Sequence, residues 1–489
     1  MKKERTMGNL GKTISYLKRN GLKDTCHTIR ERLDGSHLEQ IQRELADYEG
    51  ARFFADGLRQ AHADEVRKEQ AERRFRDEYL FSILVPAYET QEVYLKEMID
   101  SVMRQTYAKV ELIVADASQS DRVERVVEEY REYDLPIIRR ANEAYQTSYG
   151  QEYPVIRYIR LEKNEGISAN TNRALDAAKG DYIGLLDHDD VLTYDALYEV
   201  MEKLEKVPAE MVYTDEDKAD GEMKAFHTPH VKPDFNLAYL LCNNYICHFT
   251  VMRAQLMRRL RFRPEYDGAQ DYDLFLRAVT ELGSTPAEDG SRQWIPKLSV
   301  ALKARIAHVD RIVYHWRCHE SSTAANPESK RYAYEAGRRA LEEFCRNHRI
   351  DAEVAHSKHL GYYRLVEKSD VWGNYPDVAA FCGCIIAQRQ IMAGPKLGGR
   401  QLFAGLLAGY SGYMNRADFP LEVDAADERV TVFQRSYQDL FKRMEQNGQQ
   451  LSFAEKLEYI KEQGACLLYV PDDTVRGKKI ARRRTGDRM

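Results

Sequence analysis

The chain has 489 residues, of which 43% are hydrophobic and 31% charged, a composition that fits about three folded domains and excludes general disorder. The net charge of −5 is too small to indicate nucleic-acid binding, and no RNA-binding signature accompanies it. The sequence contains no run of about 18 apolar residues, the length needed to cross a bilayer. The eight scattered cysteines fit neither a disulfide framework nor a zinc ribbon. We therefore expect a cytoplasmic protein.

Residues 1–78 are expected to form a helical, basic, amphipathic amino-terminal segment. Residues 1–33 hold nine Lys and Arg against three acids. Their apolar residues recur at near-helical spacing, at Leu10, Ile14, Leu17, Ile29 and Leu33. This pattern is typical of a helix lying on a membrane surface, here the inner face of the cell membrane, and also of an ordinary solvated helix. Residues 36–78 lack proline and favour long charged helices.

Residues 79–350 alternate between strand and helix patterns. The predicted strands cover 81–85, 110–115, 155–161, 181–186 and 210–214, and the predicted helices cover 92–105, 121–131, 168–178 and 194–206. Such alternation predicts an α/β fold with a mostly parallel sheet, whose ligands bind beyond the carboxyl ends of the strands. The loops that follow strands are 86–90, 116–121, 162–167 and 187–190.

Residues 351–489 show a weaker pattern, with stretches rich in Gly and Ala followed by more helix. The last fourteen residues hold seven basic side chains and one acid, which favours a disordered basic tail. We expect an accessory domain here that packs on the preceding domain or forms a homodimer.

Three carboxylates within four residues end the strand at DYIGLLDHDD, namely Asp187, Asp189 and Asp190. Carboxylates this close repel one another, so the arrangement suits a hard divalent cation such as Mg²⁺ or Mn²⁺. The alternative is an acidic loop that caps the next helix.

Several motifs occur together in a fixed order: FSILVPAYET, VELIVADASQSD, LEKNEGISANTNRAL, GDYIGLLDHDDVL, YTDEDK and GAQDYDLFLR. Over residues 80–350 the chain resembles the inverting glycosyltransferase family 2. That resemblance implies a GT-A fold with a mixed, mostly parallel sheet, a nucleotide-sugar donor, a DXD motif and dependence on a divalent metal.

The resemblance also implies donor-binding residues. The nucleoside would be held by Pro86, Ala87, Tyr88, Glu89 and Asp116. Many relatives have a second acid after Asp116, where this chain has Ala117, so recognition of the base departs from the pattern. Tyr88 would equally well pack in the fold.

Asp187, His188 and Asp189 match the DXD motif. Asp187 would face ribose and metal, Asp189 would be the main metal ligand, and His188 would touch the donor sugar or solvent. His315 would complete the metal shell, or lie in the core or against the acceptor. Zinc is rejected for the nearby His and Cys residues, because their spacing fits no standard site.

An inverting transfer requires one carboxylate to take the proton from the acceptor hydroxyl. The family position of this base is Asp271, which precedes the helix LFLRAV. Gln270 replaces the Glu of many relatives, which makes Asp271 a better choice than Asp273. The alternative is that both acids only cap the helix.

Acceptor contacts are expected from the segments that follow the DXD motif, at Glu216, Asp217, Asn244, His248 and Trp316. Trp316 would stack on a sugar or pack in the core, and Asn244 and His248 would otherwise be a buried polar pair.

The chain is thus expected to transfer a sugar from a UDP- or dTDP-sugar to a growing cell-surface polysaccharide, cell-wall glycan or lipid-linked acceptor, as a peripheral membrane enzyme. The alternative is an inactive GT-A-like protein that binds sugar nucleotides or acts as a scaffold in a glycan-synthesis complex. A nucleotidylyltransferase is disfavoured, because VPAYETQ lacks the glycine-rich loop with Arg and Lys that such an enzyme has after its first strand.

Overall fold

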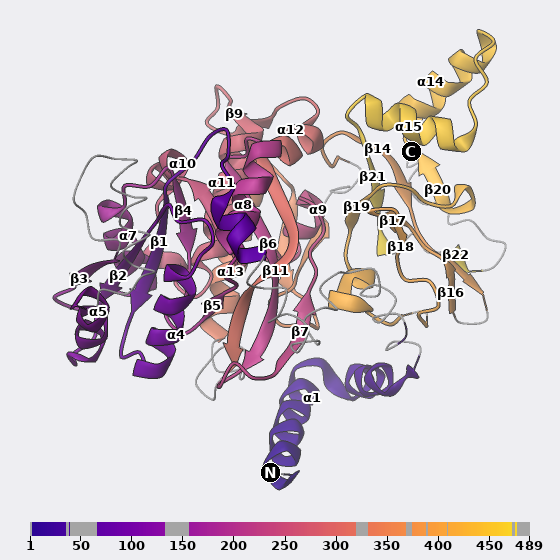
Figure 1. The fold of residues 1–489 in the computed structure, drawn as a ribbon. Coiled ribbons are helices and arrows are strands. Elements are labelled where there is room, and N and C mark those ends of the chain that lie inside the picture. Colours follow the sequence, from indigo (N-terminus) through magenta and orange to yellow (C-terminus); the bar gives the residue numbers. More distant parts are fainter. Residues whose placement is uncertain are drawn as a thin grey trace.

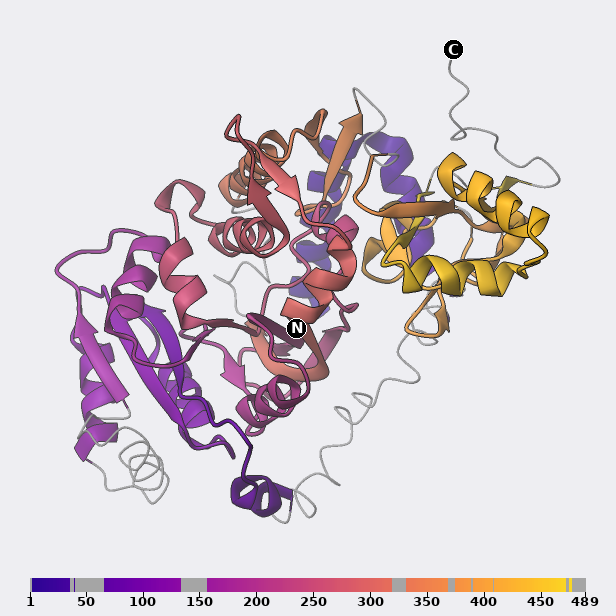
Figure 2. The same cartoon turned by 90° about the horizontal axis from the view of Figure 1, so that it is seen from above.

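A computed structural model gives the fold (Figures 1 and 2). It describes residues 2–35, 39, 66–132, 156–318, 331–367, 374–387, 390–407, 409–471 and 475–476. Most of the predicted helical stretch 36–78 and nearly all of the basic tail lie outside these residues. All eight cysteines lie within them, and none of them forms a disulfide there. In the described part of the chain, no helix is long and apolar enough to span a membrane.

A nine-stranded sheet forms the centre of the molecule, in the order β3-β2-β1-β4-β8-β6-β11-β5 with β7 beside β6. Six strands share one direction, and β5, β7 and β8 run against them. The strands are β1 (Phe81–Ala87), β2 (Val110–Asp116), β3 (Ile156–Arg160), β4 (Tyr182–Leu185), β5 (Val191–Leu192), β6 (Met211–Asp220), β7 (Phe226–His230), β8 (Thr250–Arg253) and β11 (Ile306–Cys318). The predicted mixed, mostly parallel α/β sheet is confirmed.

Helices cover both faces of this sheet, because successive residues of a strand point to opposite faces. In β1, Ile83 and Val85 pack with one group of helices, and Leu84 packs with the other. The first group is α4 (Glu92–Met103), α5 (Arg122–Glu132) and α8 (Ala196–Lys206). The second is α7 (Ile167–Ala177), α10 (Ala254–Leu260), α11 (Gln270–Gly283), α12 (Leu298–Arg305) and α13 (Arg331–Asn347).

Short elements connect these layers. They are α9 (Leu237–Leu240), η2 (Pro264–Tyr266), and two hairpins, β9 (Ser284–Pro286) with β10 (Arg292–Trp294) and β12 (Ala352–His356) with β13 (Tyr363–Glu367). The predicted helix and strand positions between residues 81 and 214 agree with the structure to within a few residues at each end. The near-continuous apolar runs of β1 and β2 explain this agreement, since both strands are buried on both faces.

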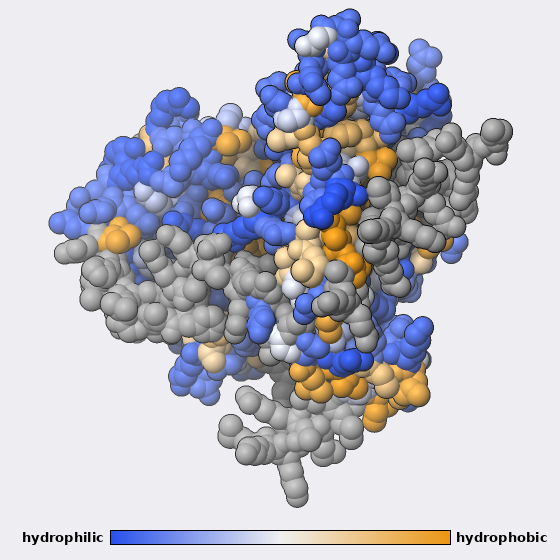
Figure 3. Space-filling view, turned by 90° about the vertical axis from the view of Figure 1, so that its right-hand side faces the viewer, coloured by the Kyte–Doolittle hydropathy of each residue, from blue (hydrophilic) through white to orange (hydrophobic). Residues whose placement is uncertain are grey.

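The C-terminal part forms a second, smaller sheet in the order β19-β21-β14-β20, with two covering helices (Figure 1). Its elements are β14 (Val378–Cys382), β15 (Ile385–Ala387), β16 (Gln390–Ala393), β17 (Lys396–Leu397), β18 (Arg400–Gln401), η4 (Tyr413–Asp418), β19 (Leu421–Val423), η5 (Glu428–Val430), β20 (Thr431–Phe433), α14 (Arg435–Gln446), α15 (Phe453–Glu462), β21 (Cys466–Tyr469) and β22 (Val475–Arg476). Seen from the right-hand side of Figure 1, where this part lies, the surface shows a band of apolar residues between hydrophilic ones (Figure 3).

This C-terminal part shares its core with the larger sheet. One group of buried apolar residues includes Phe275 of α11 together with Phe381 of β14 and Leu468 of β21. Polar contacts add to it, because Asn236 donates to the Glu422 carbonyl at 2.9 Å and accepts from the Glu422 amide at 3.1 Å. The C-terminal part therefore packs directly against the elements around the nine-stranded sheet.

The N-terminal helix α1 (Lys2–Leu33) bends at Gly21, whose φ of 78° favours glycine. Glu31 is buried and accepts hydrogen bonds from the amides of Ser411 at 2.7 Å and Gly412 at 3.2 Å. By contrast, Leu33 of the predicted apolar stripe is 81% exposed. The helix thus docks on the C-terminal part through polar residues and leaves apolar side chains on its surface.

Candidate active site

The loops that follow β1 and β2 are joined by the carboxylate of Glu89. Its Oε1 accepts from the Gln119 amide at 2.7 Å and the Ser120 amide at 3.1 Å, and its Oε2 accepts from the Ser120 hydroxyl at 2.8 Å. The hydrogen bond from the Ser120 side chain lowers the pKa of Glu89. Glu89 therefore fixes the shape of the loop pair where the nucleoside is expected.

Asp116, at the end of β2, is fully buried. Its Oδ1 accepts from the Ser118 amide at 2.8 Å, and its Oδ2 accepts from the Tyr158 hydroxyl at 2.8 Å and from Arg160 at 3.2 Å. Both carboxylate oxygens of Asp116 thus accept hydrogen bonds from other groups of the protein. Among the other predicted nucleoside residues, Ala87 is buried, Pro86 lines a cavity, and Tyr88 is 45% exposed.

The loop after β4 carries the predicted metal ligands. Asp187, His188 and Asp189 are partly exposed, whereas Asp190 is buried. The Asp190 carboxylate accepts from the Tyr314 hydroxyl and from the Arg317 amide at 2.7 Å. Burial, and after it the charges of Asp189 and Asp187, raise the pKa of Asp190. Asp190 anchors the loop, and of the other two carboxylates Asp187 lines the cavity while Asp189 is partly exposed.

Arg317 holds the same loop from β11 and is fully buried. It donates to the Asp189 carbonyl at 2.5 Å, to the Gly221 carbonyl at 2.7 Å and to the Glu97 carboxylate at 2.6 Å. No local pattern predicts this role, because a single arginine in a strand does not reveal which backbone carbonyls it will reach.

Asp271, in the first turn of α11, lies at the wall of the cavity that Asp187 also lines. The same wall includes Pro86, Cys247 and His248. Burial raises the pKa of Asp271 to about 6, and the charge of Asp187 adds to this shift while His248 opposes it. Asp271 is therefore a carboxylate whose proton affinity approaches that of a general base working near neutral pH.

Asp273, the other acid of this helix, serves the fold. It is 1% exposed, and its carboxylate accepts from Arg263 and, at 2.7 and 2.9 Å, from Arg277. The preceding loop is held in the same way, since Asp267 accepts from the Ser168 amide at 3.2 Å. The two acids of the motif thus occupy different environments, and Asp271 alone faces the cavity.

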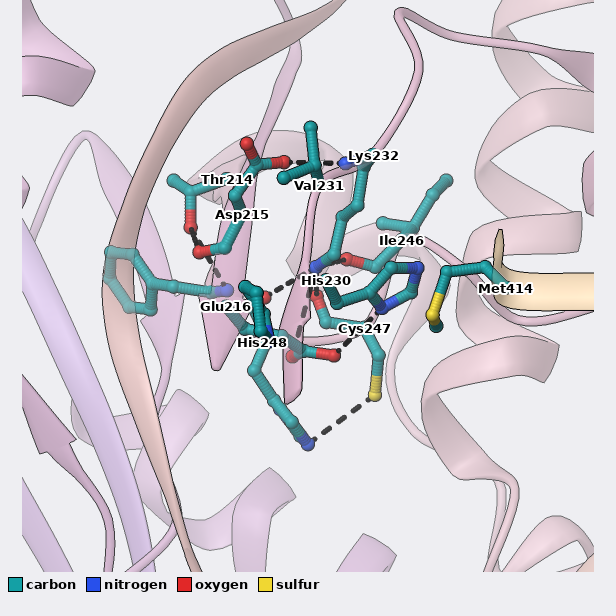
Figure 4. Close-up of polar contacts among 12 residues, drawn as sticks. Thr214, Asp215, Glu216, His230, Val231, Lys232, Ile246, Cys247, His248 and Met414 are labelled. Carbon is teal, nitrogen blue, oxygen red and sulfur yellow. Dashed lines mark hydrogen bonds and ion pairs between the residues drawn. The ribbon is translucent and has the colours of Figure 1, made fainter. Parts of the chain in front are cut away.

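A buried lysine supports the segment that brings Cys247 and His248 to the cavity (Figure 4). Lys232 is 4% exposed and donates to the carbonyls of Ile246 at 2.8 Å, Cys247 at 3.3 Å and His248 at 2.6 Å. Its ammonium lies 3.7 Å from Glu216. Although burial raises the pKa of Glu216, the Lys232 charge and the hydrogen bond with His230 lower it to about 2.

The remaining predicted acceptor residues lie on β6, on β11 and in the segment between α9 and β8. Asp217 and His315 are both buried and lie 2.6 Å apart, carboxylate to Nδ1. The His248 ring stacks on Tyr314 and meets Trp316 edge to face, with centroids 4.7 and 5.5 Å apart. The Oδ1 atom of Asn244 is buried without a hydrogen-bond partner in the described structure.

The predicted three-residue metal shell is not assembled. Across the described ranges, no three His, Cys, Asp or Glu side chains gather closely enough to hold an ion. His315 as a metal ligand stays a prediction. Asp187 and Asp189 supply the two carboxylate groups that Mg²⁺ or Mn²⁺ would need, with donor phosphates as further ligands.

Comparison with known proteins identifies the larger domain. Residues 82–263 match the family model "Glycosyl transferase family 2". An uncharacterized protein y4gI of Sinorhizobium fredii is 37% identical over 275 residues, covering 55% of this chain and 26% of that protein. The O-antigen biosynthesis protein RfbC of Myxococcus xanthus is 29% identical over 287 residues, covering 58% of this chain and 19% of that protein.

The chain spans about a quarter or less of the length of these two relatives. Among solved structures, S. aureus TarS 1-349 in complex with UDP-GlcNAc matches with 17% identity and a TM-score of 0.39, covering 55% of this chain and 67% of that one. The family match begins within β1 and ends just before η2, so it includes the loops that carry Glu89, Asp116 and Asp187. Residues 82–263, the greater part of the larger domain, are therefore similar to glycosyltransferase family 2.

Proposed function

We propose that this domain transfers a sugar from a UDP- or dTDP-sugar to a hydroxyl of a growing cell-surface or lipid-linked glycan, with inversion at the anomeric carbon. The observation that carries this proposal is that Asp187 and Asp271 line one cavity, and that Asp271 has a pKa of about 6. The cavity measures only about 30 Å³, so we place the sugar at its open mouth.

In the proposed step, the acceptor oxygen attacks the anomeric carbon while Asp271 takes the hydroxyl proton. The bond from acceptor oxygen to carbon forms, and the bond from carbon to the donor phosphate oxygen breaks. The nucleoside diphosphate leaves with the electron pair. A positioned base of this kind contributes roughly 10²–10⁴-fold to the rate, and one displacement gives one inversion.

Asp187 and Asp189 are the proposed ligands of Mg²⁺ or Mn²⁺. A bound cation would stabilise negative charge on the departing diphosphate. Arg317 and Asp190 hold the loop so that both carboxylates are presented to the donor, and His188 lies between them near the sugar. The nucleoside would rest on Pro86 and Tyr88, within the loop shape set by Glu89 and Asp116.

The acceptor would approach from the side of His248. His248 lines the cavity, and the unpartnered Oδ1 of Asn244 offers an acceptor for a sugar hydroxyl. Trp316 lies edge-on to His248 and presents an aromatic ring for sugar stacking. Glu216 and Asp217 act through Lys232 and His315, so we assign them a positioning role.

We also propose contact with the inner face of the cell membrane. In α1, exposed apolar side chains alternate with basic ones, as in helices that lie in a membrane surface. The C-terminal part, residues 351–489, is proposed as an accessory domain that supports the acceptor side, because Tyr413 accepts from the Val231 amide at 2.9 Å, next to Lys232. A homodimer through this part stays a prediction.

A screen of nucleotide sugars tests the proposal. UDP- and dTDP-linked hexoses and deoxyhexoses would be incubated with the chain and Mg²⁺ or Mn²⁺, and release of the nucleoside diphosphate measured. We expect slow hydrolysis of one donor or a few, lost in Asp271→Asn. Binding of a donor without turnover of any would favour the inactive, scaffold alternative.

A further inference from the structure

A second cleft lies between α1, the first turn of α13 and the β12–β13 turn. Its volume is about 700 Å³, and it is lined by Arg19, Asn20, Asp24, Arg331, Tyr334, Glu335, His356, Ser357, Lys358, His359, Leu360 and Arg364. The cleft exists because α1 docks here, with the Asn20 amide reaching the Lys358 carbonyl at 3.4 Å. It shares no lining residue with the Asp271 cavity.

Four Arg and Lys side chains and two acids line the cleft. Lys358 and His359 share the Asp418 carboxylate at 2.8 and 3.0 Å. His356 pairs with Glu335 at 2.8 Å. Arg331 and Arg364 are exposed, and neither forms an ion pair with any residue that the structure describes. Two guanidinium groups thus remain available, and concave walls strengthen their field.

The cleft is connected to the catalytic loop through α13. Gly268, three residues before Asp271, has a φ of 92°, and a Cβ there would lie 2.7 Å from the ring of Tyr332 and 2.9 Å from Ala333. Arg339 also donates to the Glu265 carbonyl at 2.8 Å. Arg331 directly precedes Tyr332, so the basic cleft begins where α13 touches the loop that carries the proposed base.

We propose that this cleft binds a phosphate or diphosphate ester, held by Arg331 and Arg364, on the acceptor side of the site. Guanidinium groups suit this ligand, because their planar forks pair with two phosphate oxygens at once. Only the assignment of this ligand to the acceptor rests on the proposed transferase function. The anion site itself is inferred from the lining of the cleft. The ester is either a lipid headgroup or a soluble phosphate compound.

The test is binding of inorganic pyrophosphate to the full chain by calorimetry, in EDTA, which removes the divalent cation that the proposed donor site would need. We expect binding that weakens with salt and falls at least about tenfold in the double variant Arg331→Ala/Arg364→Ala. The matched control is Arg76→Ala/Arg104→Ala, two exposed arginines outside the cleft, which should bind as the wild type does.

The source of the phosphate is tested with phosphatidylcholine vesicles, with and without phosphatidic acid. Retention that requires phosphatidic acid, Arg331 and Arg364 supports the site and assigns it to a lipid headgroup. Pyrophosphate binding without such retention supports a soluble ester. Equal binding by wild type and double variant, or no binding by either, overturns the proposal. If the chain binds pyrophosphate in the cleft but hydrolyses no nucleotide sugar, the anion site is supported and the proposed transferase function is refuted.

Discussion

Asp187, beyond the end of β4, and Asp271, in the first turn of α11, line one cavity, and their charges interact. The two residues come from elements that are far apart in sequence. They meet because β4 is paired within the sheet and α11 packs on the face that Leu84 also contacts. This arrangement places Asp271, the proposed base, in the same cavity as Asp187, a proposed ligand of the donor's cation.

The raised pKa of Asp271 predicts a stability effect. The folded-state pKa of about 6 exceeds that of an unfolded Asp, about 3.9, so ionisation destabilises the fold as pH rises from about 4 to 6. Asp271→Asn removes this cost, which is about 1–3 kcal/mol at pH 7.5 for a partly buried group. We expect its Tm to exceed that of the wild type at pH 7.5 by roughly 2–4 °C.

The gain should shrink greatly toward pH 4, where the wild-type carboxyl is protonated in the folded state and about half protonated in the unfolded state. Thermal unfolding at several pH values measures this. A constant difference between variant and wild type from pH 4 to 7.5 would show that Asp271 is not perturbed.

Asp189 is predicted to support nucleotide binding through a cation. Asp189→Ala, or EDTA with the wild type, should weaken binding of the cognate nucleoside diphosphate by about tenfold or more, since a bridging cation would be lost. Calorimetry measures the affinity. Asp77→Ala, an exposed acid outside the site, serves as the control. If the affinity is the same with and without EDTA, nucleotide binding does not depend on a divalent cation.

Lys232 is predicted to hold the acceptor wall. Lys232→Met would leave three backbone carbonyls without their donor and Glu216 without its nearest cation. Loss of one partner of a buried charge pair costs about 3–5 kcal/mol. We expect a lower Tm together with lost turnover, and Lys232→Arg should recover part of both. A Lys232→Met chain with unchanged Tm would contradict the role assigned here.

Position 268 is predicted to require glycine, because there is no room for a side chain there. Gly268→Ala would place a Cβ against Tyr332 and Ala333 and displace the loop that leads to Asp271. Gly290→Ala is a matched control, because Gly290 also has a positive φ, 80°, but has open space around it. Turnover should fall at least about tenfold in Gly268→Ala beyond any change in Gly290→Ala. Equal effects would mean that backbone strain alone matters.

The sequence predicted the elements best where local pattern and burial agree. The apolar runs of β1 and β2 and the amphipathic α8 were found because each is buried in the way its spacing indicates. The loops that hold Glu89, Asp116 and Asp187 were located from the sequence because each comes at or directly after the end of a predicted strand.

Contacts between distant segments could not be predicted. Lys232 reaches three carbonyls that follow it by more than a dozen residues, and Arg317 reaches back to the Asp189 loop. In α1, periodicity located the helix but not its docking face, because buried Glu31 rather than the apolar stripe meets the C-terminal part. Such choices depend on tertiary partners that local pattern does not contain.

The most direct test of the shared cavity is the rate of donor turnover by wild type and Asp271→Asn from pH 5 to 8, with donor affinity measured in parallel. The account predicts a wild-type rate that rises with pH through about 6, as the Asp271 carboxyl ionises. It also predicts a rate about 10²-fold lower or more in the variant, with donor affinity nearly unchanged. A variant that turns over donor at the wild-type rate would contradict it.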